Sequence, residues 1–192
     1  MEDFKENDRE RCFIAVDFEE EVLKEIARIQ GVLGNLKFTG KLTELENMHL
    51  TLKFLGEVDE EKLNLIKEKL KEVKIKTFSA KLSDVGLFNY KGKPKIVWVK
   101  IGGEGIFALQ KKIDEEMEKV GFKKEERFMS HVTLARIKYV KDAKRFKEYI
   151  QGISHKKIEF EIDRFKLNSS ELRRLGPVYR DLEVYSCNTS ES

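Results

Sequence analysis

Proline, cysteine and long apolar runs are scarce in this chain of 192 residues. Two prolines leave no Pro-rich linker that would separate domains. The two cysteines, Cys12 and Cys187, lie at opposite ends of the chain without a CxxC pair, which excludes a cysteine-based structural zinc site and favours buried free thiols. No run approaches the roughly 18 consecutive apolar residues of a membrane helix. The polar, acidic N-terminus has no apolar signal region, so we expect a cytoplasmic protein without membrane contact.

Charge is abundant but nearly balanced. Lysine and arginine number 38 against 35 aspartates and glutamates, a net charge of +3, which excludes a histone-like polycation but allows a local basic patch. Hydrophobic residues make up 40% of the chain, enough for a packed core and too many for a disordered chain. The length predicts a single domain over residues 1–192, built as two lobes in tight contact.

Apolar periodicity predicts helices and strands in a repeated order. Helices are expected over 19–33, from the N-cap Asp59 onward, over 104–120 with Gly121 as C-cap, and over 142–150. Strands are expected at 11–17, 48–55, 76–88, 95–101, 130–139, 156–168 and 178–186. Each half runs strand, long helix, strand, helix, so a duplicated strand-helix-strand unit accounts for most of the chain.

Two of the three histidines begin the same four-residue pattern, His49–Leu52 (HLTL) and His131–Leu134 (HVTL). Alternate residues of a strand share a face, so each histidine points the same way as the threonine two positions on, Thr51 or Thr133. If the two repeats oppose each other, two imidazoles and two hydroxyls converge on one cleft.

Paired imidazoles are suited to a reaction in which one takes a proton from a nucleophile and the other gives one to a leaving group. In-line displacement at phosphorus is the reaction that this arrangement serves most naturally; the threonine hydroxyls would hold the non-bridging oxygens, and no metal or other cofactor is needed. A lone histidine is more often structural, but the repeated pattern favours catalysis. His155 lacks the pattern and is expected to be non-catalytic. From the residues alone the acid and base roles of His49 and His131 are interchangeable.

These motifs resemble the 2H phosphoesterases, and more closely their RNA 2′,3′-cyclic phosphodiesterase branch, formerly called 2′-5′ RNA ligases. The resemblance rests on FIAVDF near the N-terminus, HLTLKFLGEV, GFKKE followed by HVTLARIKYV, and a late GPVY, and it covers nearly the whole chain. It implies an α+β fold of two pseudo-symmetric lobes, each an antiparallel sheet with helices packed outside, facing across a central cleft. It also implies hydrolysis of RNA 2′,3′-cyclic phosphate ends to 2′-phosphates, with reversible 2′-5′ joining in some members.

By this resemblance His49 would be the general acid that protonates the departing O3′, and His131 the general base that activates water. Thr51 and Thr133 would bind phosphate oxygens. Arg136 stands where the family has an arginine after the second tetrad, where a guanidinium suits a phosphate. Strict alternation, however, places Arg136 on the face away from His131, so it reaches the cleft only if the strand ends, twists or bulges there.

Several alternatives stay open at this point. The substrate could be a small cyclic nucleotide, an ADP-ribose cyclic phosphate or a 2′-5′ oligoadenylate instead of RNA, and cleft width would separate these. A non-catalytic RNA-end binder is the alternative from another class. Phe13, Phe54 and Tyr179 are candidates for stacking on terminal bases, with core packing as the competing role. We expect a monomer whose partner is an RNA end.

Overall fold

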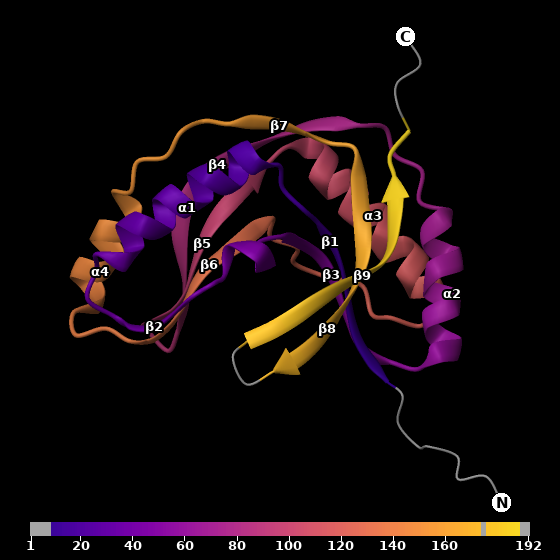
Figure 1. Cartoon of the computed structure of the whole chain (residues 1–192), viewed down its shortest axis with the longest axis horizontal. Coiled ribbons are helices and arrows are strands. Elements are labelled where there is room, and N and C mark those ends of the chain that lie inside the picture. Colours follow the sequence, from indigo (N-terminus) through magenta and orange to yellow (C-terminus); the bar gives the residue numbers. More distant parts are fainter. Residues whose placement is uncertain (1–8, 174–175, 189–192) are drawn as a thin grey trace, which may run out of the picture.

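The alternating segments form two antiparallel sheets (Figure 1). The computed structural model describes residues 9–173 and 176–188. Within these, the first sheet has the order β3-β1-β8-β9, with β3 Leu50–Val58, β1 Glu10–Val16, β8 Arg164–Arg173 and β9 Gly176–Ser186. The second sheet has the order β2-β6-β5-β4-β7, with β2 Thr39–Leu42, β6 His131–Tyr139, β5 Lys93–Gly102, β4 Phe78–Tyr90 and β7 Glu159–Ile162. The predicted α+β class with two facing antiparallel sheets is confirmed.

Four α-helices of the described chain follow the predicted periodicity: α1 Glu20–Gly34, α2 Glu60–Lys71, α3 Glu104–Lys119 and α4 Ala143–Gln151. Their ends follow from local chemistry. The Asp59 carboxylate accepts from the Lys62 amide at 2.9 Å and caps α2 as expected. The C-cap of α3 is Val120, one residue before the expected Gly121, and Gly121 follows it with a φ of +91°, the left-handed conformation that glycine adopts without strain. A short 3₁₀ turn, η1 Leu45–Asn47, leads into β3.

The helices exchange partners between the two halves. α1 follows β1 of the first sheet but packs against β6 of the second, and α3 follows β5 of the second sheet but packs against β3 as well as β4. In Figure 1, α1 and α4 lie together at one end of the molecule, while α2 and α3 lie at the other. β3 and β6, the strands of the two tetrads, contact each other where the sheets meet. The duplicated units are therefore interlocked.

Two expectations about the chain path were wrong. Residues 156–168 were expected to form one strand, but the chain crosses at Asp163 from β7 in the second sheet to β8 in the first. The buried positions are Phe160 and Ile162 before Asp163 but Phe165 and Leu167 after it, so the alternation shifts by one residue where the chain changes sheet. The segment 34–47, for which neither helix nor strand was expected, contains β2, which pairs with β6, and the short turn η1. None of the described helices is long and apolar enough to cross a bilayer.

Candidate active site

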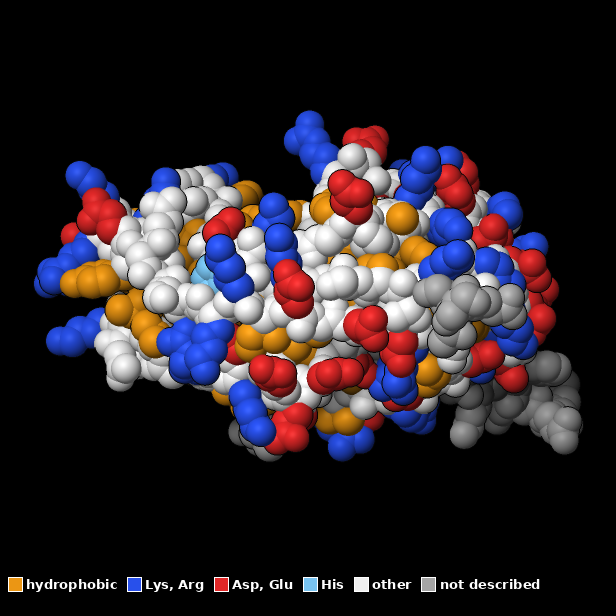
Figure 2. Space-filling model, turned by 90° about the horizontal axis from the view of Figure 1, so that it is seen from above, with side chains coloured by type: hydrophobic (Ala, Val, Ile, Leu, Met, Phe, Trp, Pro, Cys, Tyr) orange, Lys and Arg blue, Asp and Glu red, His pale blue; other side chains and the backbone are white. Residues whose placement is uncertain are grey.

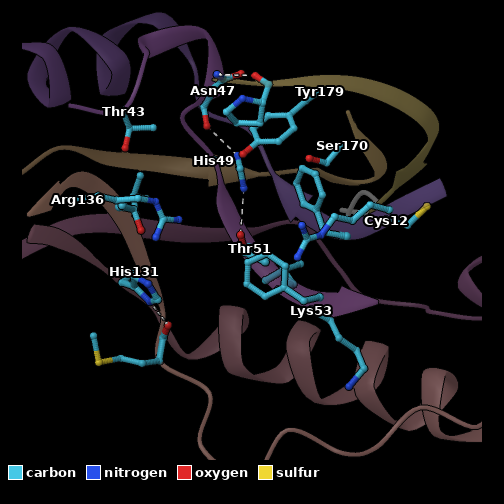
Figure 3. Close-up of a pocket in the computed structure, with 18 of the residues that line it drawn as sticks. Cys12, Thr43, Asn47, His49, Thr51, Lys53, His131, Arg136, Ser170 and Tyr179 are labelled. Atoms are coloured by element: carbon cyan, nitrogen blue, oxygen red, sulfur yellow. Dashed lines mark hydrogen bonds between the residues drawn. The ribbon is translucent and has the colours of Figure 1, made fainter. Parts of the chain in front are cut away.

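A cavity of about 1080 Å³ lies between the two sheets and is lined by residues of both. All five predicted site residues, His49, Thr51, His131, Thr133 and Arg136, lie on its wall. Figure 3 shows the His49 and His131 side chains entering the same space from different strands. Among the described residues, those of α1 to α4 do not line the cavity, so strands and loops form it and the helices lie outside.

Both catalytic-candidate imidazoles are held in the same way. His49 lies directly before β3, and its Nδ1 is 2.9 Å from the carbonyl oxygen of Asn47. His131 opens β6, and its Nδ1 is 2.7 Å from the carbonyl oxygen of Met129. A carbonyl oxygen only accepts, so Nδ1 carries the proton in both rings, and Nε2 of each neutral ring is the basic atom. The duplicated backbone therefore presents two Nε2 atoms to the cavity.

The surroundings of the two Nε2 atoms differ. His49 Nε2 lies 3.0 Å from the Thr51 hydroxyl, whereas no hydrogen-bond partner of His131 Nε2 lies among the described residues. Burial lowers the pKa of His49 below its usual value, and the hydrogen bond to the Asn47 carbonyl and the charge of Asp17 oppose this shift. Without a bound anion, His49 is therefore mainly neutral near pH 7.

Aromatic rings fix the orientation of both histidines. Phe13 and Tyr179 lie against His49 with ring centroids 4.8 and 5.2 Å away. Phe88, which the sequence reading missed, meets His131 edge-on at 5.0 Å. Phe13 is only 4% exposed, so it packs beneath His49, whereas Phe54 is 76% exposed on the cavity wall. Of the three predicted stacking candidates, Phe54 is exposed, Tyr179 is half-buried on the cavity wall and Phe13 is buried.

A β-bulge follows each threonine and brings Arg136 into the cavity. In the pairing of β5 with β6, Trp98 lies opposite Thr133 and Val97 opposite Ala135, which leaves Leu134 as the extra residue. The bulge reverses the alternation, so Arg136 lies on the same face as His131 and Thr133. Arg136 was expected to reach the cleft only if the strand ends, twists or bulges, and the bulge at Leu134 meets this condition.

The first tetrad has the same bulge. In the pairing of β1 with β3, Ile14 lies opposite Lys53 and Ala15 opposite Thr51, so Leu52 is the extra residue. The fifth residue after each histidine therefore faces the cavity. This residue is Phe54 after His49 and Arg136 after His131. Lys53 is turned instead toward α3, where it is buried.

The other chemical groups considered in the sequence fit no further catalytic role. Cys12 borders the cavity, but burial, with the nearby Glu10 charge, raises the pKa of its thiol to about 11, so it is not a thiolate nucleophile. Cys187 is likewise a buried free thiol. His155 does not line the cavity. Within residues 9–173 and 176–188, no cluster of three or more His, Cys, Asp or Glu side chains could hold a metal ion.

The model of the LigT like phosphoesterase family matches two successive segments of the chain, residues 16–98 and 100–179. The chain belongs to this family. Each matched segment contains one histidine-threonine tetrad, in keeping with the duplication read from the sequence. The predicted membership of the 2H phosphoesterases, and with it the class of enzyme, is confirmed.

Named relatives and solved structures agree with this. The RNA 2′,3′-cyclic phosphodiesterase of Methanocaldococcus jannaschii is 37% identical over 177 residues, which are 91% of this chain and 99% of that protein. That of Thermotoga maritima is 38% identical over 180 residues, 92% and 94% of the two chains. A crystal structure from Thermus thermophilus superposes with a TM-score of 0.82 at 27% identity, covering 94% of this chain and all of that one. E. coli LigT without ligand, at 21% identity, shares the fold with a TM-score of 0.76 over 95% and 99% of the chains.

Two supports of this LigT-like site were not found from the sequence. Asn47 is buried, and its carbonyl oxygen accepts a hydrogen bond from His49 Nδ1. Its side-chain Nδ2 donates to the Pro177 carbonyl at 3.2 Å, and this bond connects η1 to the start of β9. Buried Lys53 forms an ion pair with buried Asp114 of α3. Both contacts join residues far apart in the chain, and a backbone carbonyl leaves no residue-type signal.

Proposed function

We propose that this protein hydrolyses RNA ends that carry a 2′,3′-cyclic phosphate to 2′-phosphomonoesters, without a metal ion. The observation that carries the proposal is the pair of imidazoles whose Nδ1 atoms are held by carbonyls, so that both Nε2 atoms serve one cavity. The named relatives, RNA 2′,3′-cyclic phosphodiesterases that align over about nine-tenths of the chain, supply the substrate class.

In the proposed reaction His131 Nε2 removes a proton from water while the water oxygen attacks phosphorus. The P–O3′ bond breaks on the opposite side, and protonated His49 gives its Nε2 proton to O3′. The products are a 2′-phosphate and a 3′ hydroxyl, and the two histidines have exchanged protonation states. His131 Nε2, with no partner among the described residues, suits the base. A negatively charged phosphate beside His49 offsets the burial that lowers its pKa and so favours the acid form.

The remaining predicted residues hold the phosphate. The Thr51 and Thr133 hydroxyls would donate to non-bridging oxygens, and Thr51 Oγ1, which lies 3.0 Å from His49 Nε2, can link the acid to the phosphate. The Arg136 guanidinium, turned inward by the bulge at Leu134, would neutralise charge that grows in the transition state. A 5′ hydroxyl in place of water would give 2′-5′ joining by the same steps.

The size of the cavity favours an RNA end over a small cyclic nucleotide. Its 1080 Å³ lies at the upper end of the range of about 300–1,000 Å³ that holds drug-sized ligands. The exposed Phe54 ring offers a surface for a base of any identity, as a substrate defined by its terminus requires. Small cyclic nucleotides remain the second candidate because they contain the same reacting group. We further propose that the enzyme acts as a monomer in the cytoplasm, where RNA ends are available to it.

The test uses a short RNA with a 2′,3′-cyclic phosphate, incubated with the protein in EDTA, and separates 2′- from 3′-phosphate products. We expect a 2′-phosphate, and a loss of turnover in His49→Ala and in His131→Ala. His155→Ala is the matched control, since that imidazole lies outside the cavity, and it should keep full activity. Binding of the RNA with no turnover at any pH would favour the non-catalytic binder, and a rate that is flat from pH 5 to 9 would contradict the two-histidine mechanism.

A further inference from the structure

Three arginines on the cavity wall, Arg11, Arg127 and Arg136, lack a side-chain partner within the described part of the chain. Their guanidinium groups form no hydrogen bond or ion pair there. Of the other described arginines, Arg9 likewise shows none, and the rest bond to an acidic side chain or a tyrosine, as in Arg28 with Glu25 and Arg145 with Tyr149. Arg136 belongs to the proposed phosphate site, so Arg11 and Arg127 are cations whose role is unexplained.

Arg11 lies on the cavity face of β1, two residues before Phe13. Two residues of a strand span about 7 Å, so Arg11 lies one step further along the wall than the ring that packs beneath His49. Its neighbour in the pairing with β3 is Glu57, beyond the exposed Phe54. The charge of Arg11 also acts on Tyr179, where it opposes the rise in pKa that burial causes.

Arg127 lies on the loop between α3 and β6, and this loop is held in place from below. Lys53 Nζ, paired with Asp114, donates to the Lys123 carbonyl at 2.8 Å, and Asp114 Oδ2 accepts from the Glu125 amide at 2.9 Å. The buried ion pair thus fixes two backbone groups of the loop that presents Arg127. It also brings this loop next to β3, the strand that carries Phe54 and that pairs with β1, and Arg127 and Arg11 line the same cavity.

The local charge favours an anion. Of the acidic residues that line the cavity, Glu44 is paired with Lys41, which leaves Glu125 as the counter-charge in the described chain. On the face shown in Figure 2, by contrast, cationic and anionic side chains are interspersed. Neither arginine forms an ion pair with Glu57, opposite Arg11, or with Glu125 on the same loop as Arg127, and guanidinium groups that are not paired with a carboxylate suit the oxygens of a phosphate.

We propose that Arg11 and Arg127 form a second phosphate subsite, which binds the phosphodiester on the 5′ side of the nucleotide whose cyclic phosphate reacts. The RNA then leaves the cavity between β1 and the 123–129 loop, past Phe54. This inference rests on the proposed function and adds to it a direction for the chain and a minimum substrate of two nucleotides for full binding. A nucleoside cyclic phosphate, which has no 5′ phosphodiester, cannot use the subsite.

The test compares kcat/KM for cytidine 2′,3′-cyclic phosphate with that for a dinucleotide carrying the same cyclic end. In the wild type we expect the dinucleotide to be preferred. Arg11→Gln and Arg127→Gln, which keep a polar side chain without the charge, should each lower the ratio of dinucleotide to mononucleotide kcat/KM about tenfold, as for the loss of one charge-assisted contact. Arg164→Gln, an exposed arginine outside the cavity, is the control and should leave the ratio unchanged.

A ratio near one in the wild type, or one that neither variant changes, would overturn the subsite while leaving the hydrolysis intact. If the wild type hydrolyses neither substrate, the proposed function fails, and binding decides the subsite separately. For that measurement a labelled hexanucleotide ending in a 2′-phosphate is titrated with protein at several salt concentrations. Each variant should bind about tenfold more weakly and reduce the slope of log K against log salt by about 0.7, the value for one single-strand phosphate contact. Wild-type affinity and slope in both variants would overturn the subsite.

Discussion

The ion pair between Lys53 and Asp114 should cost far more to break than its surface counterparts. Each residue is 6% exposed, so removing one partner leaves a charge in the interior without its counter-charge. For Lys53→Met we expect a loss of about 3–5 kcal/mol in the free energy of unfolding. In a chain of this size that corresponds to a fall in Tm of roughly 6–20 °C.

Removing both charges should restore most of this stability. In Lys53→Met/Asp114→Asn no buried charge remains, and the amide oxygen can still accept from the Glu125 amide. What is lost is mainly the hydrogen bond to the Lys123 carbonyl, worth about 1 kcal/mol. The double variant should therefore be about 2–4 kcal/mol more stable than Lys53→Met, which is the roughly 3–5 kcal/mol cost of the single change less about 1 kcal/mol.

Urea unfolding followed by circular dichroism measures these differences as shifts in midpoint at constant m-value. Lys24→Met is the matched control because its pair with Glu20 is similarly close, 2.8 Å, but 72% and 82% exposed, so its loss should cost less than about 1 kcal/mol. If Lys53→Met costs no more than Lys24→Met, the pair is hydrated and the reasoning from burial is refuted.

Three further predictions concern the cavity. The NMR titration midpoint of His49 in the free protein should lie below the usual histidine pKa of about 6.5, and added phosphate should raise this midpoint. As the pH falls through about 6.5, the unfolded chain takes up a proton at His49 before the folded protein does, so the free energy of unfolding should decrease. Arg136→Gln should lower kcat/KM by about 10- to 100-fold, the loss of one charge-assisted contact. Phe54→Ala should weaken RNA binding by roughly 1–3 kcal/mol and change Tm little, because the Phe54 ring is 76% exposed. Phe13→Ala should instead lower the free energy of unfolding by about 3–5 kcal/mol, because Phe13 is buried.

A specific result would contradict each of these three predictions. A His49 midpoint at or above the usual value would show that burial does not control its charge. An Arg136→Gln enzyme with more than half of the wild-type kcat/KM would remove Arg136 from the phosphate site. Equal binding of RNA by Phe54→Ala and the wild type would mean that no base stacks there, and Phe54→Tyr, which keeps a ring, should bind like the wild type.

What could be read from the sequence is what local geometry determines. Alternation along a strand placed each histidine beside its threonine, and capping chemistry located the start of α2 at Asp59 and the end of α3 before Gly121. The exchange of α1 and α3 between the sheets could not be read, because each helix has one apolar stripe that either sheet would bury.

The β-bulges at Leu52 and Leu134 could not be predicted from the alternation of residues along a strand. Leu52 and Leu134 are ordinary strand residues, and nothing in their side chains signals an extra residue; the bulge arises from how β3 pairs with β1 and β6 with β5. The residues directly after each bulge therefore face opposite to strict alternation, and in β3 a second bulge at Leu55 restores it. For that reason alternation placed Arg136 outside the cleft while the family resemblance placed it inside, and the ion pair of Lys53 remained hidden.

Duplication alone would give a cavity unable to distinguish the two ends of its substrate. Both halves present an imidazole, a hydroxyl and, after the same bulge, one further side chain. That last position breaks the symmetry, because Phe54 offers an aromatic face and Arg136 a cation. In the proposed complex a base prefers the first wall and a phosphate the second, so the nucleotide has one favoured orientation. The orientation determines which histidine meets O3′, and it acts together with the different surroundings of the two Nε2 atoms.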